Sequence, residues 1–186
     1  MVSGDHCRMR TLRTDRLSLR PWEPEDADFV YDMYSRWEVQ RFIGLVPRVM
    51  EDRSEAERLI AKCRDLNHPV HGFWAVERLE DARLVGTILL KGIPASGTPP
   101  LQPSGETEIG WHFHPDSWGN GYATEAASAV LAHGLREGLE RVIAVTSAEN
   151  LASQSVCKNI GMKHQGTTNS YYNASCELFL AEDVAP

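Results

Sequence analysis

The sequence lacks the features that define several large classes of protein. No apolar run is long enough to cross a bilayer as a helix, and the first ten residues contain no apolar stretch like that of a secretory signal. The four cysteines are widely spaced and form no Cys-x-x-Cys pair, which argues against a disulfide framework or a cysteine zinc site. The formal net charge of -7 argues against a general binder of nucleic acid or of anionic membranes. We therefore expect a cytoplasmic protein with free thiols that binds neither nucleic acid nor membrane.

The length and composition are those of an ordinary globular protein. A chain of 186 residues is long enough for one well-buried domain and short for two. Hydrophobic residues make up 42% of the chain and charged residues 24%. We predict a flexible extension over residues 1–10 and a single domain over residues 11–182.

The segment Glu106–Ala127 combines a strand pattern with a helix pattern. Apolar residues alternate with other residues in its first half, until Pro115, which has no backbone N–H and ends the strand. Small and apolar residues then recur at three- and four-residue spacing over Ala123–Leu135, as in an amphipathic helix. The turn between strand and helix contains Gly119 and Gly121.

A glycine-bearing turn at the start of a helix is suited to binding phosphate. The first N–H groups of a helix lack intrahelical partners, the helix dipole is positive there, and glycine lets a ligand approach the backbone. A purely structural turn is the alternative, because a short glycine motif is a weak signal. A dinucleotide fingerprint is disfavoured, since Thr124 stands in place of its third glycine and Glu140 precedes the next strand. A P-loop is disfavoured too, because the chain has no Gly-Lys-Ser/Thr triplet.

Two motifs of this chain resemble those of the GNAT acetyltransferase superfamily. The residues Glu-Ile-Gly-Trp from Glu108, followed by Trp-Gly-Asn-Gly-Tyr-Ala from Trp118, are similar to the acyl-CoA signature of the branch that contains the Rim-type (RimJ/RimL-like) ribosomal-protein N-terminal acetyltransferases. Trp118 departs from the general superfamily pattern but matches this branch. Asn150-x-x-Ser153, with Gly161 eight residues later, resembles the second CoA motif of the same branch. Asn150 is also a good helix N-cap and Gly161 a good helix stop.

The resemblance covers about Thr11 to Ala181 and implies a fold and a reaction. The fold is α/β (α+β): the GNAT acyl-CoA N-acyltransferase fold, with a mixed central sheet of about six to seven strands flanked by about four helices. The reaction implied is N-acetyl transfer from acetyl-CoA, as cosubstrate, to an amine acceptor by direct attack in a ternary complex. The acceptor would be a protein N-terminus, an amino acid, a polyamine or an amino sugar, and the protein a monomer or homodimer. A non-catalytic acyl-CoA-binding or sensing protein and an NAD-binding module are the alternatives.

The resemblance also implies which residues bind CoA. Backbone groups of the strand hold the pantetheine arm, and amides of the glycine turn bind the pyrophosphate. The implied residues are Trp111, His112, Phe113, Trp118, Gly119, Asn120, Gly121, Tyr122, Ala123, Thr124, Asn150 and Ser153.

Two residues are candidates for catalysis. Glu108 is the first candidate for general base, with a structural carboxylate as its alternative role, and Ser153 is the candidate that stabilises the leaving thiolate. His112 and His114 share a strand face and could also accept a proton, but no third ligand suggests a metal. Many GNAT enzymes have a tyrosine where this chain has Cys157, which we expect to be a buried and unreactive residue.

The remaining predictions concern the acceptor side. Leu12–Pro21 reads as a first strand, and two helices, one from Pro24 and one over Ser54–Leu66, border the acceptor pocket in the family. The Pro-rich segment Gly92–Gly105 is expected to be neither helix nor central strand. It is either a passive surface insertion or a loop that shapes acceptor choice.

Overall fold

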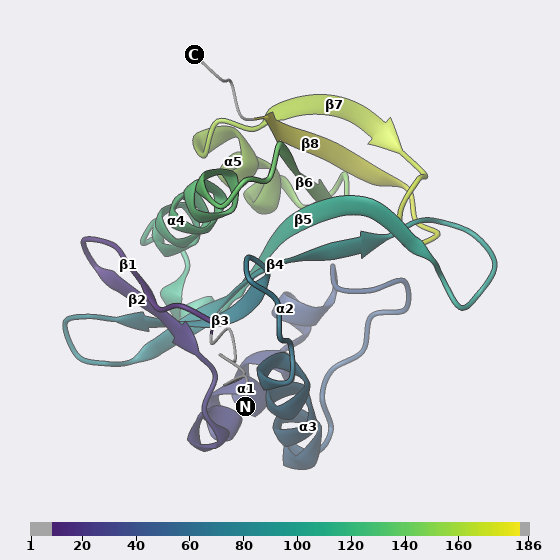
Figure 1. Ribbon diagram of the computed structural model, residues 1–186. Helices are drawn as coiled ribbons and strands as arrows, with labels where there is room; N and C mark the ends of the chain where they lie inside the picture. Colours follow the sequence, from purple (N-terminus) through teal and green to yellow (C-terminus); the bar gives the residue numbers. More distant parts are fainter. Residues whose placement is uncertain (1–8, 183–186) are drawn as a thin grey trace, which may run out of the picture.

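A single eight-stranded sheet forms the centre of the computed structural model, which describes residues 9–182 (Figure 1). The strand order is β1-β2-β3-β4-β5-β6-β8-β7. The strands are β1 (Leu12–Arg13), β2 (Leu17–Pro21), β3 (Gly72–Arg78), β4 (Leu84–Pro94), β5 (Pro103–Phe113), β6 (Arg141–Thr146), β7 (Lys163–Thr168) and β8 (Cys176–Glu182). The extension predicted for residues 1–10 lies outside the described residues except for its last two positions.

Five α helices and two short 3-10 helices complete the described chain. The α helices are α1 (Ala27–Tyr34), α2 (Trp37–Gln40), α3 (Arg53–Arg64), α4 (Tyr122–Arg136) and α5 (Leu151–Asn159), and the 3-10 helices are η1 (Pro24–Asp26) and η2 (Pro115–Ser117). No helix within residues 9–182 is both long and apolar enough to cross a membrane.

The sheet is mixed, as expected, because β5 and β6 run parallel while all other neighbours are antiparallel. The described chain has eight strands where about six to seven were predicted, and five α helices where about four were predicted. The single strand predicted over Leu12–Pro21 is divided by a turn, in which the Thr14 hydroxyl oxygen accepts a hydrogen bond from the amide of Leu17 at 3.0 Å. The additional helix is the one-turn α2, which is too short to produce a periodic pattern.

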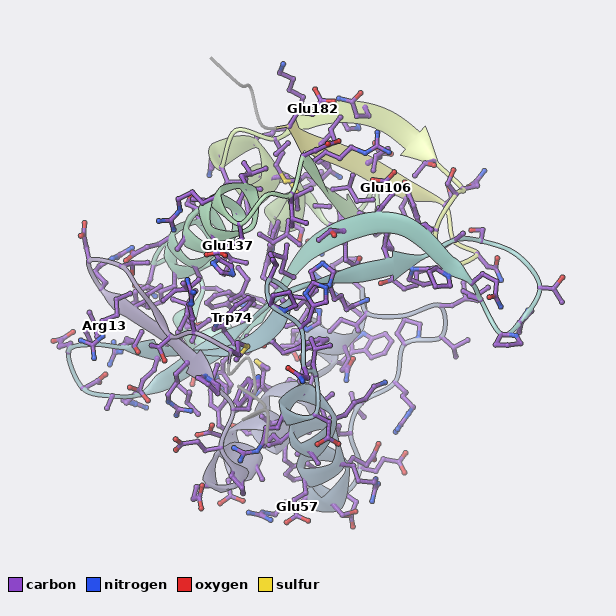
Figure 2. All side chains as sticks on the ribbon, viewed as in Figure 1. Arg13, Glu57, Trp74, Glu106, Glu137 and Glu182 are labelled. Atoms are coloured by element: carbon purple, nitrogen blue, oxygen red, sulfur yellow. The ribbon has the colours of Figure 1, made fainter. Side chains whose placement is uncertain are left out.

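Helices cover both faces of the sheet and create two hydrophobic cores (Figure 1). One core packs α4 and α5 against apolar residues of β5 and β6, including Ile109 and Phe113. The other packs α1 and α3 against the opposite face, around Met33 and Ile60. Trp74 of β3 is 1% exposed and lies near the middle of the molecule (Figure 2). Because helices cover both faces of the sheet, successive side chains of β5 point in turn into buried surroundings on one face and on the other.

The predicted helix boundaries at the motifs are confirmed. Gly121 precedes α4 with a φ of 77°, and Gly138 follows it with a φ of 97°. The side chain of Asn150 caps α5 by accepting a hydrogen bond from the amide of Ser153 at 3.1 Å. Gly161 ends that helix with a φ of 84°. These positive φ values are readily available to glycine and strained for other residues.

The prediction that Gly92–Gly105 contains no central strand is wrong at both ends. β4 continues to Pro94 and β5 begins at Pro103, and these two prolines are register partners at the end of the hairpin. The register shifts between Gly92 and Pro94, so the missing proline N–H falls at an irregular position of the ladder. Only residues 95–102 form the connection between the two strands.

Candidate active site

The parallel strands β5 and β6 separate soon after they meet. Glu108 and Ile143 are their only register pair among the described residues, although β5 continues to Phe113 and β6 to Thr146. Beyond Glu108, the edge of β5 that faces β6 therefore has backbone groups without a strand partner in the described part of the chain. An extended ligand with amide groups can hydrogen-bond to such an edge as an added strand does.

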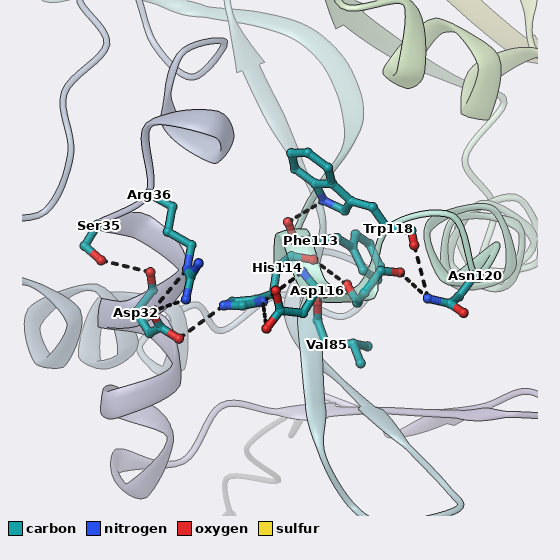
Figure 3. Close-up of polar contacts among 10 residues, drawn as sticks. Asp32, Ser35, Arg36, Val85, Phe113, His114, Asp116, Trp118 and Asn120 are labelled. Carbon is teal, nitrogen blue, oxygen red and sulfur yellow. Dashed lines mark hydrogen bonds and ion pairs between the residues drawn. The ribbon is translucent and has the colours of Figure 1, made fainter.

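The turn after β5 is fixed by side chains that bond back to the backbone (Figure 3). The indole N–H of Trp118 donates to the carbonyl of Phe113 at 2.9 Å. The amide of the Asn120 side chain donates to the carbonyls of Ser117 and Trp118 at 3.0 and 3.1 Å. The turn is thus rigid before any ligand arrives, which reduces the entropy lost on binding.

The backbone of this turn is suited to binding a phosphate group. Gly119 and Gly121 have φ values of 78° and 77°, and a Cβ added at Gly119 would meet no atom within 4 Å. Within residues 9–182, no group accepts a hydrogen bond from the backbone amides of residues 119–124. These free amides lie at the positive end of α4, where an anion is stabilised.

Arg16 lies beside the same turn, and the sequence analysis did not identify it as a site residue. Its guanidinium donates to the carbonyl of Asn120 at 3.0 Å, pairs with Glu125 at 2.6 Å and lies 5.0 Å from the ring centre of Tyr122. Burial opposes ionisation of Glu125, but hydrogen bonds from Thr14 and Arg16 outweigh it and lower the pKa of Glu125. No local pattern could reveal this contact, because Arg16 and Asn120 are far apart in the sequence and meet only through packing.

Ser153 and Cys157 both lie on α5, on the same side of the sheet as α4 (Figure 1). Ser153 is half-buried, and no described residue hydrogen-bonds to its hydroxyl. Cys157 is buried, and burial raises the pKa of its thiol to about 12. The expectation that Cys157 is a buried thiol is therefore confirmed, and a raised pKa is typical of an unreactive cysteine.

Glu108 lies on the opposite face and is bound by two residues. It is 7% exposed, forms an ion pair with Lys91 and accepts a hydrogen bond from the hydroxyl of Tyr172. Lys91 also donates to the Tyr172 hydroxyl at 2.7 Å. Both partners of Glu108 contact Oε1, and no described group hydrogen-bonds to Oε2. Every fully buried side-chain polar atom of the described residues has a partner, so Oε2 is accessible from outside the protein.

Tyr172 is a second residue that the sequence analysis missed. Burial and the nearby charge of Glu108 raise its pKa, so the hydroxyl stays protonated and acts as a donor. It comes from the turn between β7 and β8, and its φ of 57° is unusual for a residue other than glycine.

The connection between β4 and β5 (residues 95–102) is bound to the turn that carries Tyr172. The contacts are a bridge between Ala95 and Tyr171, a hydrogen bond from the Ser96 amide to the Ser170 carbonyl (2.7 Å), and two bonds between Gly97 and the Asn173 side chain (2.7 and 3.0 Å). Residues 95–102 are thus held against a neighbouring turn. They lie at the end of β5 opposite the glycine turn (Figure 1).

The two histidines share a face of the sheet, as predicted, and both contact α1. The Nδ1 of His112 bonds to the hydroxyl of Tyr34 at 2.7 Å. The Nε2 of His114 lies 3.1 Å from a carboxylate oxygen of Asp32, as Figure 3 shows. Burial lowers the pKa of His112 to about 4, so this imidazole is neutral at pH 7. Within residues 9–182, no three His, Cys, Asp or Glu side chains form a group that could hold a metal ion.

Separated parallel strands beside a helix with free N-terminal amides can hold an extended ligand that carries a phosphate group. Residues 16–163 match the family described as "Acetyltransferase (GNAT) domain", and the chain belongs to this family. The family carries out acetyl transfer to amines with acetyl-CoA as cosubstrate, and the chain is accordingly an acyltransferase enzyme.

Individual relatives agree with this assignment. The chain is 32% identical to "Uncharacterized N-acetyltransferase YoaA" of Bacillus subtilis, over 86% of each chain. It is 25% identical to a GNAT-family acetyltransferase of known structure from Bacillus anthracis, with a TM-score of 0.71 over 92% of this chain and 96% of that one. The fold is also shared, at 14% identity and a TM-score of 0.75 over 93% and 98% of the two chains, with RimL, a ribosomal L7/L12 alpha-N-protein acetyltransferase solved with coenzyme A.

Proposed function

We propose that residues 11–182 form one catalytic domain that transfers the acetyl group of acetyl-CoA to a primary amine by direct attack in a ternary complex. The observation that carries this proposal is the opening between β5 and β6, which leads to the free amides of residues 119–124. The pantetheine arm would lie along Trp111, His112 and Phe113 and bond to their backbone. The pyrophosphate would bind the turn from Trp118 to Thr124, next to Arg16.

The chemistry requires one bond to form and one to break. The neutral amine attacks the thioester carbonyl carbon, a C–N bond forms, and the C–S bond breaks to release CoA as a thiolate. The amine must lose a proton and the thiolate must be stabilised or protonated. No covalent enzyme intermediate is needed, which agrees with the unreactive state of Cys157.

The two catalytic candidates lie on opposite faces of the sheet at this opening. Ser153 belongs to the side of α4 and α5, where the glycine turn would hold CoA, and Glu108 belongs to the side of α1 and α3. Attack from one face and departure toward the other would require this separation. We infer that Oε2 of Glu108 accepts the amine proton and that Ser153 donates a hydrogen bond to the departing thiolate.

Lys91 and Tyr172 position Glu108 in this proposal. Both contacts are made to Oε1 and hold the carboxylate in one orientation, which leaves the second oxygen for the amine.

The test is acceptor-dependent release of CoA, followed with a thiol reagent. Wild type should release CoA only when an amine acceptor is present. Glu108→Gln, which keeps the shape but cannot accept a proton, should lower kcat/KM on the order of 100-fold, within the usual range for loss of a general base. The loss should be largest at low pH, where the amine is hardest to deprotonate. Full activity of the variant across the pH range would exclude Glu108 from the mechanism.

The same assay separates the enzyme from a non-catalytic acyl-CoA sensor. A sensor would bind acetyl-CoA in calorimetry but release no CoA with any acceptor. A panel that includes peptide N-termini, amino acids, polyamines and amino sugars covers the amines that this family suggests as acceptors.

A further inference from the structure

A cavity of about 230 Å³ lies between the helices α1, α2 and α3 and the face of the sheet that carries Glu108. Its walls come from all three helices and from β3, β4 and β5, and include Val30, Leu59, Phe73 and Leu89. Protein interiors are close-packed and contain few voids larger than a water molecule. An apolar cavity of ~150 Å³ is enough to bind benzene. The present cavity is larger and can hold an aromatic ring or a branched aliphatic group.

The walls of this cavity carry no charged group. Among the residues that line it there is no Asp, Glu, Lys or Arg. Two of its polar groups are already engaged: the Tyr34 hydroxyl bonds to His112 at 2.7 Å, and the Thr87 hydroxyl donates to the carbonyl of Trp74 at 3.0 Å. Gln40, with its side-chain amide, and Trp22, with its indole N–H, also line the cavity. A second ammonium group would find no carboxylate there, and a set of sugar hydroxyls would exceed the few polar groups of the wall, so burying either is costly. An apolar occupant needs no partner.

The wall of the cavity includes the strand face that carries Glu108. His112, in its wall, shares a strand face with Glu108, and Gly110 lies between them. The side chain of Leu89, which also lines the cavity, covers Gly110. Each two-residue step along a strand is about 7 Å. An amine beside Glu108 and an apolar group against Leu89 in the cavity would therefore be joined by a spacer of a few bonds.

Building on the proposed acetyl transfer, we propose that this cavity binds the apolar part of the acceptor, and that the acceptor is a primary amine with an aromatic or branched aliphatic group a few bonds from its nitrogen. The Tyr34–His112 pair forms an uncharged part of the wall at β5. Small arylalkylamines and peptides with a bulky apolar first residue fit this description, whereas polyamines and amino sugars do not.

The first experiment uses the wild-type protein and three amines: 2-phenylethylamine, spermidine and glucosamine. We expect 2-phenylethylamine to have at least a ten-fold higher kcat/KM than the other two, and to bind in calorimetry with CoA present. If spermidine or glucosamine is the equal or better acceptor, the cavity proposal is overturned while acetyl transfer stands. If 2-phenylethylamine binds but none of the three amines is acetylated, the cavity proposal stands and the proposed acetyl transfer is overturned.

The second experiment fills the cavity from α3. Cys63 lines the cavity, so Cys63→Phe should raise the KM for 2-phenylethylamine at least ten-fold and leave the kinetics with methylamine, which cannot reach the cavity, within two-fold. Ala61→Phe, on the exposed face of the same helix, is the matched control and should change neither. Equal effects of Cys63→Phe on both amines would contradict the proposal. If Cys63→Phe does not fold, the wild-type comparison still decides.

Discussion

Replacement of Gly121 by alanine tests whether the turn before α4 binds CoA. Gly121 has a φ of 77°, and a Cβ there would lie 3.5 Å from Arg16, which is an ordinary contact. The cost to folding is therefore mainly backbone strain of ~1–2 kcal/mol. The protein can relieve that strain only by rotating the peptide, which turns the amides of Gly121 and Tyr122 away from a ligand.

The loss of one amide bond to a charged phosphate sets the expected size of the effect. Hydrogen bonds to charged groups contribute ~1.5–3 kcal/mol, so CoA should bind Gly121→Ala about 10- to 100-fold more weakly. Calorimetry measures this affinity, and urea unfolding measures the free energy of unfolding.

The chain offers a matched control at the other end of the same helix. Gly138 has a φ of 97°, and a Cβ there would meet no atom within 4 Å. Gly138→Ala should lose a similar free energy of unfolding but bind CoA normally. If both variants bind CoA equally well, the turn does not contact the cosubstrate and the reasoning fails.

Four further predictions follow from the contacts described. Arg16→Gln should weaken CoA binding roughly two- to five-fold in calorimetry, because an exposed charge contributes ~0.5–1 kcal/mol, and unchanged affinity would remove Arg16 from the site. Ser153→Ala should lower kcat more than it weakens acetyl-CoA binding, as steady-state kinetics and calorimetry together can show. Burial lowers the pKa of His112 from 6.5 to about 4, so between these pH values the unfolded chain binds a proton that the folded chain does not, and stability falls as pH falls. In urea unfolding, the free energy of unfolding of His112→Gln should therefore decrease by roughly 3 kcal/mol less than that of wild type between pH 7 and pH 4. A Gly-Ser linker in place of residues 95–102 should raise the acceptor KM while acetyl-CoA affinity stays within a few-fold. A large loss of CoA affinity would show that this segment supports the CoA site and not the acceptor site.

Local patterns in the sequence predicted the parts of the site that depend on backbone conformation. Gly121, Asn150 and Gly161 mark helix ends because only certain residues cap a helix or adopt a positive φ. The alternation along β5 predicted that Ile109 and Glu108 face opposite sides, and the structure confirms it. The Pro-rich segment was harder, because proline excludes a regular ladder position but not a bulge or the end of a hairpin.

Only the tertiary structure could show which distant residues meet. Arg16 reaches the turn after β5 because β2 and α4 pack together, and Tyr172 reaches Glu108 because β8 lies next to β6 while β7 takes the edge of the sheet. The cavity under α1 and α3 depends on how well many side chains fill a shared space. The sequence by itself thus determined the turn that would bind CoA, since φ preferences and capping are local. The partners of Glu108 and the shape of the cavity under α1 and α3 follow from strand order and packing, which no short stretch of sequence encodes.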